Sequence, residues 1–106
     1  MSEEQEVRQI KRQRATMLKL VRQGHESQLH RMDDFEMWAA MQDLGMQMGR
    51  RQVLTMLQDM AVFGYVRFRQ GFDEDQEHIC LTEIELTALG TAITVRRQSN
   101  DEVLFG

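Results

Sequence analysis

The chain has 106 residues, of which 42% are hydrophobic and 28% charged, and it contains no proline. Its length and composition predict one globular domain and exclude a disordered chain, while the lack of proline favours long helices. No apolar run approaches the roughly 20 residues of a membrane-spanning helix, and residues 1–6 lack the apolar segment of a signal peptide. Because the single Cys80 cannot form an intrachain disulfide, we expect a soluble cytoplasmic protein.

The formal net charge of −4 is unevenly distributed along the chain. Between Arg8 and Arg31 there are seven cations and one anion, Glu26. Four acids then fall within a short later segment: Asp73, Glu74, Asp75 and Glu77. An acidic chain with a concentrated basic segment is compatible with DNA binding; the alternative is that the basic segment is an ordinary solvated helix face.

The first predicted element is an amphipathic helix that begins near Glu3. Its apolar positions have helical spacing and become denser toward the C-terminal half. They are Val7, Ile10, Met17, Leu18 and Val21. We expect the helix to end at Gly24, in a C-cap position. Residues 1–14 are expected to form a charged extension that projects into solvent or packs on a second subunit.

A second helix is predicted to begin after Asp33. Asp33 followed by Glu36 at the third helical position resembles a capping box, and Gly45 is expected to stop the helix. The side chains expected on its buried face are Phe35, Trp38, Ala39, Met41 and Leu44.

A third helix is predicted from near Gly49 to Ala61, with Gly64 just after its end. The side chains expected on its buried face are Val53, Leu57, Met60 and Ala61. The segment between the second and third helices is longer than the compact turn of most helix-turn-helix proteins, so we expect it to be loose.

The period of the apolar pattern changes after Gly64. Residues 65–69 alternate apolar and basic side chains, and residues 79–86 are rich in β-branched and apolar residues. We predict a β-hairpin with a long acidic tip from Gln70 to His78.

Thr87 is expected to cap a last helix over residues 88–97, with Leu89, Ala92 and Ile93 on one face. Residues 98–106 are expected to form a C-terminal tail, which is polar and linker-like over residues 98–102. The predicted domain therefore spans residues 1–97.

The order of elements, three helices, two strands and a last helix, is the outline of a winged helix-turn-helix, a mostly helical α+β fold. In the third helix, Val53, Leu57 and Met60 are followed by Gly64 and the apolar start of a strand. This resembles the recognition helix of winged-helix transcriptional regulators of the MarR, PadR and ArsR groups. Segment 86–90, LTALG, also resembles the L-T-x-x-G with which many such wings return into a final helix. The resemblance covers roughly residues 15–97 and implies a transcriptional regulator that binds double-stranded DNA.

A helix in this position enters the major groove, where Arg pairs with guanine and Gln with adenine. The face opposite the expected core begins with Arg50, Arg51 and Gln52, which we expect to contact bases or phosphates. Arg67 and Arg69 alternate outward on the first wing strand, where phosphates would pass. The candidate DNA-contacting residues are Arg50, Arg51, Gln52, Thr55, Gln58, Arg67 and Arg69. The competing interpretation of these side chains is a solvated face.

Two features favour another function, that of a winged-helix protein-interaction module without DNA binding. The acids of residues 73–77 at the wing tip would repel phosphates. Leu54 places an apolar side chain on the nominally exposed face of the third helix, where it suits a thymine methyl group or a partner protein. A protein bound at the wing tip is therefore the alternative to DNA.

A homodimer is expected from apolar side chains left over once the core is assigned. Val7 and Ile10 near one end of the chain, and Ile93 and Val95 near the other, exceed what one small core requires. The expected core itself combines Leu18, Val21, Phe35, Trp38, Val53, Leu57, Met60, Val66, Phe68 and Leu86.

No pattern indicates an enzyme, a metal site or a cofactor. His25, His30 and His78 are scattered, and no nucleophile–base spacing or glycine-rich phosphate loop occurs. Cys80 is interpreted as a small core residue, with a redox sensor as the alternative. The nine methionines are interpreted as adaptable core filler, the alternative being a methionine-lined groove.

Overall fold

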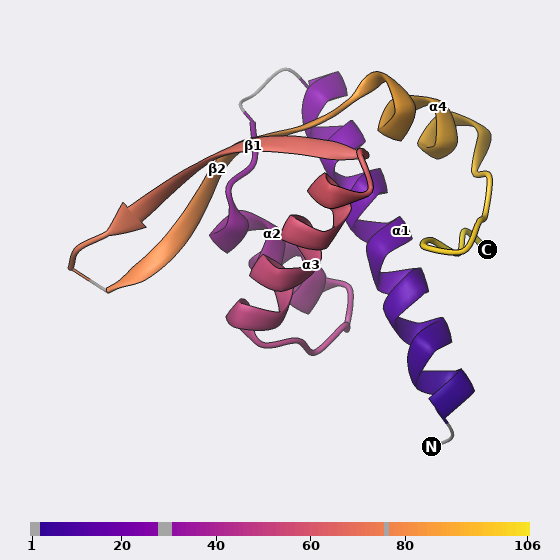
Figure 1. The fold of residues 1–106 in the computed structure, drawn as a ribbon, viewed down its shortest axis with the longest axis horizontal. Helices are drawn as coiled ribbons and strands as arrows, with labels where there is room; N and C mark the ends of the chain where they lie inside the picture. Colours follow the sequence, from indigo (N-terminus) through magenta and orange to yellow (C-terminus); the bar gives the residue numbers. More distant parts are fainter. Residues whose placement is uncertain (1–2, 28–30, 76) are drawn as a thin grey trace.

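Six elements follow one another in a computed structural model that describes residues 3–27, 31–75 and 77–106. In chain order they are α1 (Glu3–Ser27), α2 (Asp34–Asp43), α3 (Arg50–Val62), β1 (Val66–Asp73), β2 (His78–Leu86) and α4 (Ala88–Arg96). The fold is the mostly helical α+β arrangement expected from the sequence, with a two-stranded antiparallel hairpin (Figure 1). This order is consistent with a winged helix, and we call the hairpin the wing. No helix within the described residues is long and apolar enough to cross a membrane.

α1 is one unbroken helix of 25 residues. Its predicted end at Gly24 is therefore wrong, because a glycine inside a helix costs only about 1 kcal/mol relative to alanine and a long packed helix tolerates it. The second half of α1 is buried in the core through Ala15, Met17, Leu18 and Val21. Figure 1 shows its first turns projecting beyond the other elements.

The N-terminus of α2 has the predicted capping box. The Glu36 amide donates a hydrogen bond to Asp33 Oδ1 at 2.7 Å, and the Asp33 amide donates to the Glu36 carboxylate at 3.3 Å. Two otherwise unpaired amides of the first turn are thereby satisfied.

The buried side of α2 differs from the prediction. Met37 and Met41, one helical turn apart, are fully buried. Phe35 lies two positions before Met37 and so points away from that side; it is 50% exposed, and its placement in the core is wrong. Leu44 is exposed because it is the C-cap residue, beyond the last turn of the helix.

The segment between α2 and α3, expected to be loose, is held by side chains of α2. Trp38 Nε1 donates to the Met48 carbonyl at 2.7 Å, and Gln42 Oε1 accepts from the Met48 amide at 2.9 Å. Met48 is itself buried. These contacts position the start of α3, which follows its N-cap residue Gly49.

The wing pairs β1 with β2 from Val66 opposite Leu86 to Asp73 opposite His78. The predicted tip of residues 70–78 is wrong, since both strands continue and only residues 74–77 connect them. The apolar alternation of β1 stops early because residues 69–72 are all exposed, yet the backbone ladder continues (Figure 1).

A register shift between Arg67 and Arg69 bends the wing near its base. On the opposite strand Glu83 has a φ of 53°, and the Ile84 amide donates to the Met32 carbonyl at 3.0 Å. The segment before α2 thus adds a single bridge to the wing and holds its base against the helices.

Thr87 caps α4 as predicted, because its hydroxyl oxygen accepts from the Gly90 amide at 3.0 Å. Gly90 lies against the backbone of Tyr65, where an added Cβ would stand 2.0 Å from the Tyr65 carbonyl oxygen. Ile93 is buried, as the predicted helix face requires, whereas Leu89 is exposed.

Residues 98–106, which the sequence suggested to be a tail, fold back along α1. The Leu104 amide donates to the Lys11 carbonyl at 3.1 Å, and Val103 and Phe105 are buried in the core. The Tyr65 hydroxyl donates to the Glu102 carboxylate at 3.0 Å. Burial raises the pKa of Tyr65, and this hydrogen bond adds to the effect.

The expected core is confirmed except at Phe35. Trp38 and Phe68 are partly buried against it, and the other seven expected residues are buried. Met37, Met41 and others fill the interior, as expected of adaptable core residues.

Leu57→Ala should lower the free energy of unfolding by about 2–5 kcal/mol, the usual range for truncating a buried leucine, because Leu57 is 0% exposed on the inner face of α3. Urea unfolding followed by circular dichroism measures this change. Val62→Ala, at a residue 84% exposed on the same helix, is the matched control and should cost less than about 0.5 kcal/mol. Equal effects of the two substitutions would contradict the orientation of α3.

Two glycine substitutions should have opposite effects. Gly90→Ala should destabilise the protein by about 1–3 kcal/mol, because the new methyl group collides with the Tyr65 backbone. Gly24→Ala meets no atom within 4 Å and should stabilise the protein by about 0.5–1 kcal/mol, since alanine favours the helix. Thermal unfolding of both variants tests this, and a loss of stability in Gly24→Ala would argue against the continuous α1.

Candidate nucleic-acid interface

α3 presents a polar outer face because its inner face is fully used by the core. Val53, Met56, Leu57 and Met60 are buried against the other elements. The predicted contact residues Arg51, Gln52 and Thr55 are exposed on the outer face, and Gln58 is half-buried. The structure therefore leaves most of the predicted helix residues accessible to a ligand.

Arg50 is accessible only in part, because its neighbours hold its guanidinium. The guanidinium carbon lies 4.9 Å from the ring centroid of Phe35, and Nη2 lies 3.9 Å from Asp34 Oδ2. The ring of Phe35, on the side of α2 away from the core, thus forms a platform for Arg50.

Asp34 joins three elements, a role that was not expected from the sequence. Its side chain is buried, and its Oδ1 accepts from the Leu81 amide of β2 at 3.0 Å, while Oδ2 faces Arg50 of α3. The sequence did contain a signal for this role. Asp33 alone is sufficient to cap α2, so the second acid of the Asp33–Asp34 pair was free to have another function.

Arg51 lies one residue into α3 and is exposed. Within the described part of the chain, its guanidinium has no hydrogen-bond or ion-pair partner. It is therefore the arginine of α3 whose five donors are available for an external acceptor.

The wing arginines are paired with acids of the opposite strand. Arg69 Nε lies 2.8 Å from Glu83 Oε2, Arg67 forms an ion pair with Glu85, and Arg31 Nη2 lies 3.0 Å from Glu85 Oε2. Three arginines and two glutamates leave this surface a net charge of only +1. Exposed pairs of this kind contribute little to stability, but they reduce the charge offered to a phosphate.

The predicted contact residues consequently fall on two separate surfaces. Arg67 and Arg69 line a depression on the wing together with Arg31 and the two glutamates. Arg50 and Arg51 line a cleft between α3 and the wing. The structure does not bring the two groups into one site.

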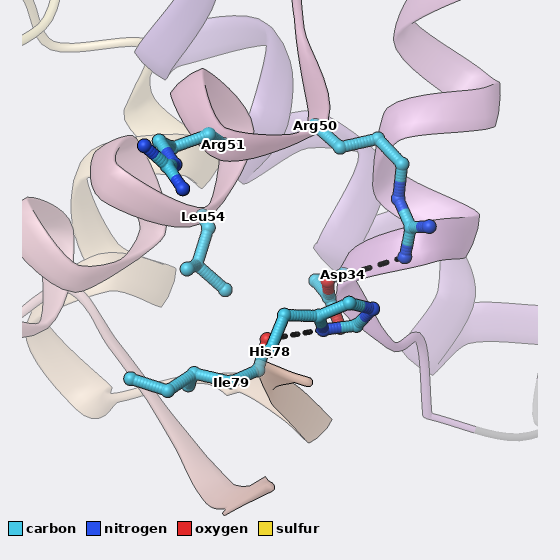
Figure 2. A pocket seen from close by; sticks show the side chains of 6 residues that line it. All are labelled: Asp34, Arg50, Arg51, Leu54, His78 and Ile79. Carbon is cyan, nitrogen blue, oxygen red and sulfur yellow. Dashed lines mark hydrogen bonds and ion pairs between the residues drawn. The ribbon is translucent and has the colours of Figure 1, made fainter. Parts of the chain in front are cut away.

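We call this second hollow the helix–wing cleft; it has a volume of about 270 Å³. It is lined by Asp34, Arg50, Arg51, Leu54, His78 and Ile79. Figure 2 shows Leu54 pointing from α3 toward the wing, with Arg51 on one side and Arg50 beside Asp34 on the other.

The wing tip is acidic and lies just beyond the cleft. Glu74, Asp75 and Glu77 are exposed, and Asp73 is half-buried at the end of β1. The Asp75 amide donates to Asp73 Oδ1 at 3.0 Å, which shapes the turn. Phosphates approaching α3 along the wing would meet this negative charge.

Among the described residues, no three histidine, cysteine or acidic side chains are grouped to hold a metal ion. Cys80 is half-exposed on β2 opposite Gly71, so its placement in the core is not supported. The expectations for His25 and His30 concern side chains outside the described part of the structure. No protein-family model, no curated protein and no solved structure matches this chain.

Asp34→Ala should lower the free energy of unfolding by about 1–3 kcal/mol, because the Leu81 amide loses its acceptor in a buried position. Asp33→Asn at the neighbouring residue preserves a good N-cap and should change stability much less. Chemical denaturation of the two variants is the measurement. Similar small losses in both would show that Asp34 does not join α2 to the wing.

Proposed function

We propose that this chain is a transcriptional regulator that reads the major groove of double-stranded DNA with α3. The observation that carries the proposal is the exposed guanidinium of Arg51, without a partner among the described residues, on the first turn of a helix whose opposite face is buried. Gln52 and Thr55 extend the same polar face. Arg and Gln are the side chains that pair with guanine and adenine in the major groove.

The paired state of the wing arginines limits their part in binding. A phosphate contact by Arg67 or Arg69 requires exchange of the ion pairs with Glu85 and Glu83. The acidic tip adds repulsion close by. We therefore assign recognition chiefly to α3, with the wing arginines as secondary phosphate contacts.

We further propose that the regulator acts as a homodimer, as helix-turn-helix proteins that bind two half-sites do. Of the apolar side chains expected to be left over, Val7 and Val95 are exposed, whereas Ile93 is buried and Ile10 is partly buried. Val7 in the first turns of α1 and Val95 on α4 are thus the parts of that expectation that the burial pattern still supports.

A second candidate function is a protein-interaction module without DNA binding. The observation that favours it is the apolar wall of the helix–wing cleft next to the acidic wing tip, because a partner with apolar and basic side chains would match both. A protein with this function would have little affinity for DNA.

The test is fluorescence anisotropy over a salt series with two labelled DNAs, a duplex selected from genomic fragments by its binding to this chain and a mixed-sequence pool that reports non-specific binding. Arg51→Ala should weaken specific binding by about 1–3 kcal/mol, because the variant cannot form the hydrogen bonds between the guanidinium and a base. Arg96→Ala is the matched control, because Arg96 is exposed and belongs to α4, which Figure 1 shows on the other side of the molecule from the wing tip. Reversing Asp73, Glu74 and Asp75 to Lys should tighten non-specific binding by removing repulsion.

Binding should weaken steeply with salt, because each neutralised phosphate releases counterions. An absence of binding at about 50 mM salt, where electrostatic association is strong, would refute the DNA-binding proposal and favour the interaction module. Equal reductions of affinity in Arg51→Ala and Arg96→Ala would show that α3 does not read the bases.

A further inference from the structure

The outer edge of β1 is open. Within the described part of the chain, β2 is the single strand neighbour of β1, and the extra bridge made by Met32 lies on β2. Residues 69–72 of β1 are all exposed, on a part of the wing that projects away from the helices (Figure 1). An edge strand with unpaired backbone groups can pair with another extended chain.

The Leu81 amide shows which backbone groups point outward from this edge. That amide donates to Asp34 and not to β1, although Leu81 lies directly opposite Gln70. Opposite residues of an antiparallel ladder exchange either both hydrogen bonds or none, so the N–H and C=O groups of Gln70 also point away from β2. Because the direction alternates along a strand, the backbone groups of Phe68 and Phe72 point outward as well.

Two residues of this edge are not required by the fold of a single chain. Phe72 is 61% exposed, and Ile79, directly opposite it on β2, is 38% exposed. Gly71 lies outside the left-handed region, and an added Cβ would stand at an ordinary contact distance of 3.5 Å from Cys80 Sγ. An exposed aromatic side chain and a glycine within a strand are both typical of a place where another backbone approaches.

The apolar side chains of β1 are complementary to a second copy of the same strand. When the two strands run antiparallel with Gln70 opposite Gln70, Phe68 of each copy lies opposite Phe72 of the other. The outward backbone groups of these three residues then meet as hydrogen-bonded pairs. Cross-strand aromatic pairs stabilise sheets, and this register would cover the exposed ring of Phe72.

The other face of the strand is complementary in charge and size. In the same register Arg67 lies opposite Asp73 of the second copy, and Arg69 lies opposite Gly71, which leaves space for the long side chain. Opposite charges across strands are favourable. Arg67 already forms an ion pair with Glu85, but a guanidinium has five donors and can bind a second carboxylate.

The acidic wing tip also favours the antiparallel arrangement. The tip of one wing would lie beside the base of the other, where three arginines and two glutamates leave a net charge of +1. A parallel pairing would place the two acidic tips together, where like charges repel. The acids of the tip are Asp73, Glu74, Asp75 and Glu77.

We propose that the free edge of β1 binds β1 of a second copy, antiparallel and centred on Gln70, so that two wings form one four-stranded sheet. The same patch is used by both copies, as a two-fold axis requires. This surface for self-association is separate from that of Val7 and Val95, and it does not rest on DNA binding by α3.

Sedimentation equilibrium of the full chain tests the association. The unmodified chain should form dimers with a Kd of about 1 mM or tighter. Gln70→Pro should abolish them, because proline lacks the central outward N–H, which the wing itself does not use. Phe72→Thr should weaken them about 5-fold or more, since each dimer loses two aromatic pairs. Val62→Thr, at an exposed apolar residue of α3, is the matched control and should have no effect.

The outcomes separate this surface from the first turns of α1. A chain that stays monomeric at about 1 mM, or dimers that Gln70→Pro and Phe72→Thr leave unchanged, would overturn the pairing of wings. Loss of dimers in Val7→Asp alone would also overturn it and would uphold the α1 surface. Loss in the two wing variants, with Val7→Asp unchanged, would uphold the pairing of wings.

Disulfide cross-linking in a Cys80→Ser background tests the register. Gln70→Cys should cross-link two copies on mild oxidation, because hydrogen-bonded opposite residues have Cα atoms about 5.5 Å apart, which suits a disulfide. Arg69→Cys, one residue along and on the opposite face of the strand, should cross-link much less. Equal cross-linking of the two variants, or none in Gln70→Cys, would overturn the register.

Discussion

The position of α3 beside the wing depends on the buried carboxylate of Asp34. Removing a carboxylate from water is costly unless hydrogen bonds and an opposite charge replace the water. Here the Leu81 amide of β2 donates to one oxygen, and Arg50 of α3 faces the other. Since Asp34 is the first residue of α2, one side chain connects two helices and the wing. The width of the helix–wing cleft follows from this connection.

The contact with Asp34 gives Arg50 and Arg51 of α3 different roles. Arg50 completes the Asp34 contact and rests on Phe35, whereas Arg51, one residue further along α3, is left exposed. On the wing, Arg67 and Arg69 are neutralised across the strands by glutamates. An acidic protein can thus keep a small accessible positive charge on one helix while the arginines of its wing are paired with glutamates. This distribution supports recognition by α3 more than by the wing.

The order of elements and the helix caps could be predicted because they depend on short-range signals. Asp33 and Thr87 cap their helices through bonds made within three residues. Long-range contacts were harder to predict from the sequence. The polar composition of residues 98–102 concealed the return of the chain to α1, because that return depends on burial of Val103. In the sequence, Asp34 looked like an ordinary acidic residue at a helix N-terminus. Its role as an acceptor could not be predicted because the donor is the Leu81 amide of β2, 47 residues further on.

The outer face of α3 is the proposed DNA-contacting surface. An NMR titration of the ¹⁵N-labelled chain with a mixed-sequence duplex at low salt maps the contact directly, residue by residue. If α3 contacts DNA, the largest amide shifts and line broadening should fall on residues 50–58, with smaller changes near Arg67 and Arg69 and none at the acidic tip. Shifts confined to the wing or to α1, or no shifts at all, would contradict it.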